Sequence, residues 1–430
     1  MNKELLERAE TLWKQDERIG RLGSRFNYTY APGATGKVFE DIQRLESELP
    51  ERANPTKEEE LHEAELKRGL QSRMLQLEHF LEGKPYTVES IIKLYGLDQS
   101  DLNAIQPWLK ANRPAAVQAL EGLFRLTEVE SYEYGLSTDI PRVQRQAEGF
   151  AATQISNYHR KLSSLFIGLT HAGEFLYRIT PEPSTADRSY FASKSKVLAV
   201  SMARICYQEE DGTIQLRERE LIRLYGHEGM GHGLHSIITE ASDLPFFLKE
   251  PSHAAEAVEE SIAQHFEKVI FDDLKNSLDV QKDLRVQERF SEIFEEEKNT
   301  RLVNAYNRML YYYSILVLAD KSIGDPEDPE TLTRKMELIS EHTINRGYAR
   351  NIVERNRREF DSQGNLSASL TSELRYSSRA VQRGLEVFEK HDIIYDHHDQ
   401  RSQIDMNFLT GYYTPIGFVQ KALLAAGGKI

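Results

Sequence analysis

Apolar residues recur at helical spacing along most of the chain, and this pattern predicts a mainly helical protein. Residues 4–13 and 66–81 both place leucines and other apolar side chains three or four positions apart, as amphipathic helices do. Residues 25–36, between these segments, contain Pro32 and two glycines, so we expect a loop there. Another helix is expected over residues 154–169, from the same spacing of apolar positions.

The clearest strand signals come just before the middle of the chain. Residues 196–208 and 213–216 are rich in apolar and β-branched side chains, which favour strands. The acidic residues and glycine at 209–212 predict a turn between them, and hence a hairpin or a small sheet. From Glu218 onward the pattern is helical again almost to the end. Breaks in this pattern fall at residues 242–247, 323–330 and 361–365.

Charge and composition narrow the class of protein. The chain has 54 Lys and Arg against 68 Asp and Glu, a net charge of −14, whereas binding to nucleic acid or to a membrane surface needs a basic face. No apolar run approaches the roughly 20 residues that span a bilayer, and no secretory signal is apparent at the start. We therefore expect a cytoplasmic protein without nucleic-acid or membrane partners. Cys206 is the only cysteine, which excludes an internal disulfide and a zinc site built from cysteines.

Four side chains of metal-binding type lie close together in one predicted helix: His227, Glu228, His232 and His235. The common zinc-peptidase pattern places two histidines four residues apart on one helix face, but here the second histidine comes five residues after the first. On a regular α-helix these two would be about 140° apart. A π-type turn would bring them onto one face.

The glycines at positions 226, 229, 231 and 233 support a distorted helix around these histidines. Each glycine costs about 1 kcal/mol relative to alanine in a helix. We expect them where the backbone comes close to a metal or a substrate.

A hydrolytic zinc site needs a third protein ligand and leaves the fourth position to water. The candidates follow the histidine motif in the sequence: Glu250, Glu256, Glu259 and Glu260. The apolar stripe of the same predicted helix consists of Val258, Ile262, Phe266 and Val269. Glu259 lies at the margin of this stripe and Glu260 farther round, so the helical wheel slightly favours Glu259 as the buried residue. A ligand that faces a cleft need not lie on the stripe, so the wheel leaves both open.

The two motifs together resemble a known family. The run from His227 to His232, followed by the segment Val258–Ala263, is similar to the His-Glu-x-x-x-His peptidases typified by the microtubule-associated tyrosine carboxypeptidases. The resemblance implies that His227, His232 and Glu260 bind one zinc ion per chain and that Glu228 is the general base. Ser261 and Ile262 replace the glycine and leucine of the family's second motif.

Two later segments resemble the family more weakly. Residues 370–376 are similar to its Phe-Thr-Lys-Asp-x-x-Tyr segment, although Ser372 replaces the lysine, and residues 355–358 are similar to its basic stretch. We expect Tyr376 or a nearby arginine to donate a hydrogen bond to the tetrahedral oxyanion. Arg355 and Arg375 are candidates for binding the terminal carboxylate of a substrate.

The predicted fold is a mainly α, zincin-like metallopeptidase with a small β-sheet before the active-site helix. Residues 1–135 would form a helical N-terminal region and residues 136–430 the catalytic domain. The predicted function is that of a zinc-dependent peptidase, a carboxypeptidase acting on the C-terminus of a peptide or protein. One alternative is a thimet-like oligopeptidase, because the segment Glu250–Ser252 imperfectly resembles the segment that carries the third zinc ligand in that group. Another is a non-catalytic helical interaction protein with structural zinc or none.

Other polar or aromatic clusters are interpreted as structural. One zinc with three ligands leaves no position for His235 or His253, so both are expected outside the ligand set. Residues 391–400 are rich in Asp and His but lack a helical or strand register, and are predicted to be a polar loop. The tyrosines at 311–313 are expected within a core helix.

Overall fold

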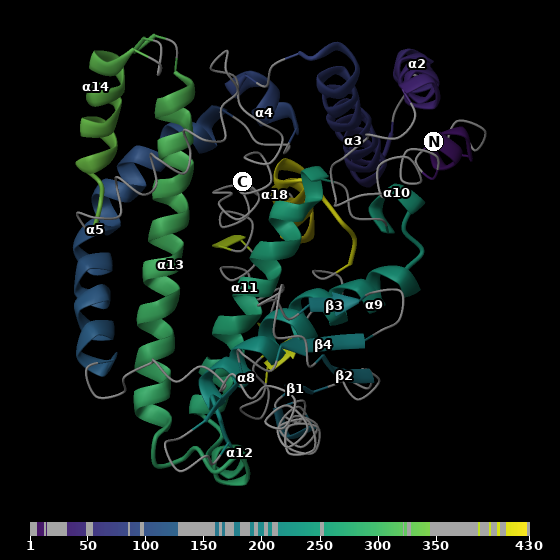
Figure 1. Ribbon diagram of the computed structural model, residues 1–430. Coiled ribbons are helices and arrows are strands. Elements are labelled where there is room, and N and C mark those ends of the chain that lie inside the picture. The colour runs from purple at the N-terminus through teal and green to yellow at the C-terminus, as the bar shows by residue number, and fades with distance from the viewer. Residues whose placement is uncertain are drawn as a thin grey trace.

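The computed structural model gives a mainly helical protein (Figure 1), as predicted. The residues that it describes are 7–12, 14, 32–48, 55–84, 87–94, 99–127, 160–162, 166–167, 176–180, 190–192, 197–201, 205–208, 214–249, 253–320, 322–324, 328–344, 386–387, 395–396, 402–404 and 410–427.

Helices make up both ends and the centre of the described chain. Those before the motif are α2 (Pro32–Glu48), α3 (Lys57–Glu82), α4 (Val88–Leu94) and α5 (Gln99–Thr127). The motif region consists of α8 (Glu218–Leu224), the π-helix η2 (Tyr225–Leu234), α9 (His235–Ala241), α10 (Phe246–Lys249) and α11 (His253–Lys275). The remaining ones are α12 (Leu278–Asp283), α13 (Phe290–Ala319), α14 (Pro329–Ser340) and α18 (Pro415–Ala425).

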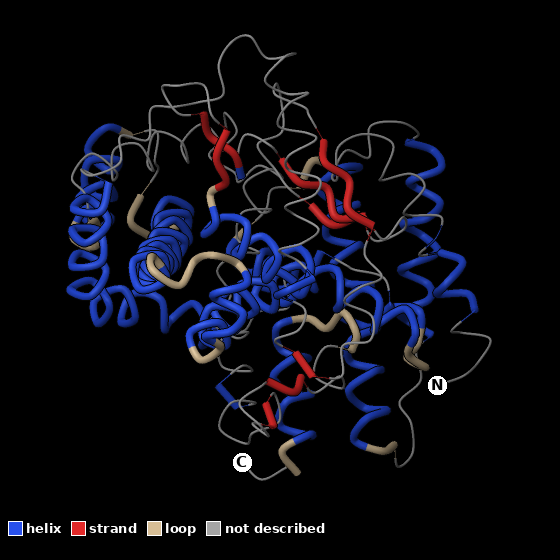
Figure 2. The backbone as a smooth tube through the Cα atoms, turned by 90° about the horizontal axis from the view of Figure 1, so that it is seen from below, coloured by secondary structure: helices blue, strands red, loops and turns tan. Residues whose placement is uncertain are grey.

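The strands are short and form three separate groups (Figure 2). In chain order they are β1 (Phe166–Ile167), β2 (Leu176–Thr180), β3 (Tyr190–Ala192), β4 (Val197–Ser201), β5 (Cys206–Gln208), β6 (Ile214–Leu216), β7 (Tyr395–Asp396) and β8 (Ser402–Ile404). One group has the order β2-β4-β3, with β2 parallel and β3 antiparallel to β4. The second pairs β1 in parallel with β8, which is antiparallel to β7, and the third is the hairpin β5-β6.

Local sequence patterns predicted some of these elements better than others. Helix α3 covers the predicted segment 66–81, and the hairpin lies where residues 196–216 predicted one. The prediction of a loop over residues 25–36 is wrong for its last residues, because α2 already begins at Pro32. Proline is well tolerated in the first turn of a helix, where its missing N–H would have no intrahelical acceptor.

Two further expectations fail where strands form between distant segments. Of the helix predicted over residues 154–169, residues 160–162 are helical in the structure. Phe166 and Ile167 instead form a strand that pairs with Ser402 and Gln403. The polar loop predicted at residues 391–400 contains the short strand β7. Such pairing depends on a partner far away in the sequence, which the local pattern does not show.

Two hydrophobic cores lie side by side in the helical body. The first joins α2, α3, the motif helices, α11 and α18, and includes Leu198 and Val200 of β4. The second is formed by α5, α13 and α14, and α13 runs beside both of the others in Figure 1. The tyrosines at 311–313 belong to this second core, with Tyr312 fully buried, so their interpretation as core residues is confirmed.

The C-terminal segment connects the N-terminal helices to the motif region. Thr414, at the N-cap of α18, donates from its backbone N–H and its hydroxyl to the carboxylate of Glu65 on α3, at 2.6 and 2.8 Å. Gly411 bonds to His235 and Thr239 of α9. These contacts hold the surroundings of the motif together from segments far apart in the sequence.

The N-terminal helices share a core with the motif. Leu61 and Leu66 of α3 pack in the same cluster as Leu221 and Ile262. The predicted boundary between residues 135 and 136 lies outside the described residues. Among the helices that the structure describes, none is both long and apolar enough to cross a bilayer.

Candidate metal centre

The two motif histidines lie on a π-helix. Residues Tyr225–Leu234 form η2, continuous with α8 before it and α9 after it. Its i to i+5 geometry turns His227 and His232 to the same side, with ring centroids 5.0 Å apart. The π-turn predicted from the five-residue spacing is therefore confirmed.

The glycines of η2 allow it to pack closely against α11. A Cβ atom at Gly226 would lie 2.8 Å from the carbonyl oxygen of Phe266, and one at Gly231 would lie 2.3 Å from the Cα of Ala263. These pairs show that η2 and α11 run antiparallel. We expected the glycines to bring the backbone close to a metal or a substrate; at these two positions the structure shows an approach to a neighbouring helix instead.

Substitution of Gly231 by alanine should therefore destabilise the protein. The added methyl group would overlap backbone and side-chain atoms of Ala263, at 2.3 and 2.6 Å, so the helices must separate. We expect a loss of about 1–3 kcal/mol in the free energy of unfolding, as for overpacked cores. Gly36→Ala is the matched control, because a Cβ there meets nothing within 4 Å and alanine favours α2 by up to about 1 kcal/mol. Urea denaturation measures both, and equal stability of the two variants would contradict the close approach.

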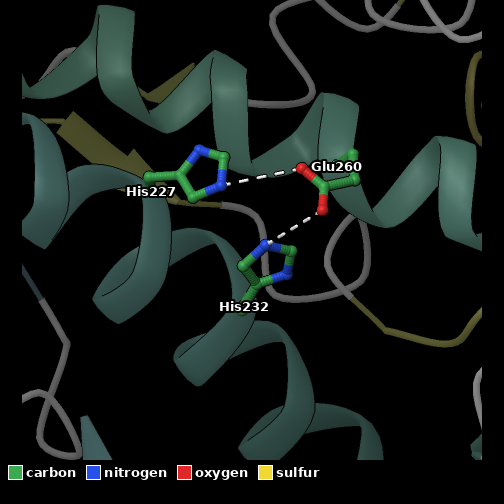
Figure 3. A group of neighbouring side chains, drawn as sticks. All are labelled: His227, His232 and Glu260. Carbon is green, nitrogen blue, oxygen red and sulfur yellow. Dashed lines mark ion pairs between the residues drawn. The ribbon is translucent and has the colours of Figure 1, made fainter. Parts of the chain in front are cut away.

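Three ligand atoms converge from η2 and α11 (Figure 3). Nε2 of His227 lies 3.6 Å from Oε2 of Glu260, and Nε2 of His232 lies 3.8 Å from Oε1 of Glu260. One atom from each of these residues lies within 4.8 Å of the other two. Each side chain is partly buried, at 13 to 17% of its full exposure. The structure thus brings together the three residues predicted as zinc ligands.

Glu259 takes a different position from Glu260. Its Oε1 lies 3.0 Å from Nδ1 of His232, on the ring edge that faces away from Glu260. Glu259 can therefore orient the imidazole, while Glu260 faces both Nε2 atoms. The alternative that the helical wheel slightly favoured does not match this geometry.

The donor set fits zinc. Two imidazoles and one carboxylate are a common ligand set of catalytic zinc. Ligands about 2.0–2.1 Å from a tetrahedral ion lie about 3.3 Å apart. The two nitrogen–oxygen distances, 3.6 and 3.8 Å to different oxygens of Glu260, exceed this value by a few tenths of an ångström. In addition, both histidines carry a carboxylate at Nδ1, which favours the tautomer whose Nε2 is free to bind metal.

A second carboxylate supports His227 in this way. Oε1 of Glu267 lies 2.8 Å from Nδ1 of His227, but the angle at the nitrogen is too small for a regular hydrogen bond. The same oxygen accepts a hydrogen bond from Arg223 at 3.0 Å. Burial alone would raise the pKa of Glu267, but His227 and Arg223 lower it to about 2. Glu267 is therefore an ionised acceptor.

Negative charge exceeds positive charge around the two imidazoles. Burial alone would lower the pKa of His232, but the hydrogen bond to Glu259 and the charges of Glu259 and Glu260 raise it to about 10. A cation bound between the Nε2 atoms and Glu260 would replace the extra proton of His232 and would neutralise the negative charges of Glu259 and Glu260 instead.

Glu228 lies next to the first ligand and contacts the neighbouring strand. Its Oε2 accepts a hydrogen bond from the backbone N–H of Phe191 on β3, at 3.2 Å. Burial raises the pKa of Glu228, while the two histidines lower it. A carboxylate whose pKa is raised is better matched to accepting a proton near neutral pH.

His235 lies outside the ligand set, as predicted. It is fully buried, and Nε2 donates to the carbonyl oxygen of Gly411 at 3.1 Å. Burial lowers its pKa to about 4, so the ring is neutral. His235 anchors the C-terminal segment to α9 and belongs to the packing around the site.

Some predicted site residues lie outside the described residues, and others were missed. Arg355, Arg375 and Tyr376 belong to the first group. Two groups at the site, Glu267 and the backbone N–H of Phe191, were not predicted from the sequence. Glu267 could have been found, because it follows Glu260 by two helical turns and so shares its face of α11. The contact of Phe191 depends on how β3 packs against η2, for which the sequence carries no local signal.

Comparison with known proteins adds no relative. The chain matches no protein-family model, no curated protein and no solved structure. The resemblance of its motifs to the carboxypeptidase family is a hypothesis that no relative supports.

Proposed function

We propose that this protein is a zinc-dependent peptidase with a zincin-like fold, and that it removes residues from the C-terminus of a peptide or protein. The observation that carries the proposal is the convergence of His227, His232 and Glu260, with Glu228 beside the first of them. A glutamate next to a histidine ligand is the arrangement in which zinc peptidases place their general base.

Zinc bound at this centre would act as a Lewis acid on the scissile carbonyl and would lower the pKa of the attacking water. Glu228 takes a proton from that water as its oxygen adds to the carbonyl carbon. When the C–N bond breaks, Glu228 delivers the proton to the departing amine. Burial of Glu228 and its hydrogen bond from Phe191 limit the positions that its carboxylate can take for these two transfers.

Strand β3 borders the position of Glu228. In the described part of its sheet, β3 pairs with β4 on one side. The N–H of Phe191 points to Glu228 on the other side. A substrate bound beside Glu228 would therefore have β3 along one side.

The carboxypeptidase part of the proposal comes from the motif resemblance. An enzyme of this kind binds the free carboxylate at the end of its substrate, and a bidentate arginine is the natural partner. We propose Arg355 or Arg375 for this contact. For Tyr376 we propose hydrogen bonding to the oxyanion.

A peptide tested in its free-acid and C-terminally amidated forms checks this specificity. We expect the acid form to be cleaved with a kcat/KM on the order of a hundredfold higher, because the amide leaves an arginine without its charged partner. Peptide products identified by mass spectrometry should lack single C-terminal residues. Arg355→Ala or Arg375→Ala should reduce the advantage of the acid form.

The same experiment separates the alternatives. Equal cleavage of both forms at an internal bond would indicate an oligopeptidase and contradict the carboxypeptidase proposal. Intact peptides after incubation with the zinc-loaded protein would favour a non-catalytic protein with structural zinc.

A further inference from the structure

Glu267 connects a predicted metal ligand to a buried network of charges. It lies on α11 two turns after Glu260, so both carboxylates face η2. Glu260 faces Nε2 of His227 at 3.6 Å, and Glu267 faces Nδ1 of the same ring at 2.8 Å. The imidazole therefore lies between a ligand carboxylate and a supporting carboxylate of one helix.

The network holds Glu267 in place from the opposite side. Arg223 of α8 donates to Oε1 of Glu267 at 3.0 Å and to Glu220 at 3.1 and 3.2 Å. Glu220 also accepts from Arg219 at 2.5 Å, and Arg219 reaches Glu296 and Glu297 of α13. The contacts thus extend from His227 through α8 to a helix outside the metal centre.

The carboxylate beside His232 is less enclosed. The side chain of Glu259 has 22% of its full exposure, whereas that of Glu267 has 9%. Glu259 also directly precedes the ligand Glu260 in the sequence, so its position follows from that of the ligand itself. Glu267 is fixed independently of Glu260, through Arg223.

We infer that Glu267 is a positioning residue for metal binding. Its Oε1 lies 2.8 Å from Nδ1 of His227 and favours a proton on that nitrogen, which leaves Nε2 unprotonated and turned toward Glu260. Arg223 keeps the carboxylate close to the ring. This inference rests on the metal site proposed above and adds a residue that would set its affinity. Partners of this kind orient a ligand and raise its basicity, and their loss typically weakens metal binding by about 10–100-fold.

Zinc affinity of the Glu267→Gln protein, measured by competition with a chromogenic chelator, tests the inference. We expect a loss of about 10–100-fold relative to wild type, with the folded state retained because the amide keeps the shape of the side chain. Lys335→Met is the control, since Lys335 is fully buried and donates to the carbonyl oxygens of Leu318 and Asp320 in the second core, outside the contacts that reach Glu267. It should lower the thermal stability and leave zinc affinity within about threefold.

The tautomer of His227 is a second measurement, because it would not change if Glu267 had a purely structural role. In metal-free protein labelled with ¹⁵N-histidine, at a pH where the ring is neutral, NMR should find the proton on Nδ1 in wild type, with His227→Gln used for assignment. In Glu267→Ala, if it folds, the share of this tautomer should fall. A proton on Nε2 in wild type would overturn the inference.

The outcomes also separate this inference from the proposed function. Tight zinc binding by wild type and equally by Glu267→Gln would overturn the inference alone, as would equal losses in Glu267→Gln and Lys335→Met. A wild-type protein that binds no zinc would overturn both.

Discussion

His227→Ala and His232→Ala proteins should each lose stoichiometric zinc. Each substitution removes one of the three converging ligand atoms, and two remaining donors are too few for a tightly held catalytic zinc. The loss of affinity should exceed the roughly 10–100-fold that follows from changing an outer partner. Elemental analysis after dialysis against a weak chelator measures the bound metal, and peptide hydrolysis should disappear with it.

Two substitutions close to the ligands in the sequence serve as controls for this result. His235→Ala should keep its zinc, although losing the bond to Gly411 should lower its stability. Glu259→Gln should keep much more zinc than Glu260→Gln, because only Glu260 faces both Nε2 atoms. Retention of zinc by both histidine variants, with loss in His235→Ala, would show that the metal centre is placed wrongly.

Glu228→Gln should keep its zinc and lose its activity. The amide preserves the size of the side chain but cannot take a proton from water, and general-base catalysis is typically worth about 10²–10⁴ in rate. Metal content should be close to that of wild type, since Glu228 is not among the three converging residues. Single-turnover hydrolysis of the peptide used above measures the rate of the chemical step.

The comparison of Glu228→Gln with Glu228→Asp refines this result. Aspartate keeps a proton acceptor but shortens the side chain, so it should retain more activity than glutamine. A glutamine variant within about tenfold of the wild-type rate would exclude Glu228 as the base. A variant that loses both zinc and fold would instead give Glu228 a structural role through Phe191.

The sequence by itself determined the local features of this protein. The five-residue spacing of His227 and His232, together with the glycines around them, predicted a π-turn, because helical hydrogen bonds join residues close together in the chain. The apolar periodicity likewise predicted α3 and the core helix α13. The residue types of the motif predicted His227 and His232 as ligands but left Glu259 and Glu260 open as the third, and Glu260 was chosen from the resemblance to the carboxypeptidase family.

Only the tertiary structure decided how these elements meet. A helical wheel gives the angle of each side chain around its own axis, but the direction of the partner helix depends on packing. The contact of Gly231 with Ala263 sets the register of η2 against α11, and this register places Glu260 at both Nε2 atoms and Glu259 at an Nδ1 atom. The support of His227 by Glu267, and the strand pairing of residues 166–167 with 402–403, likewise join segments that no local pattern connects. Packing between distant segments follows from the shapes and charges of whole surfaces, so the chain has to be folded before these contacts can be identified.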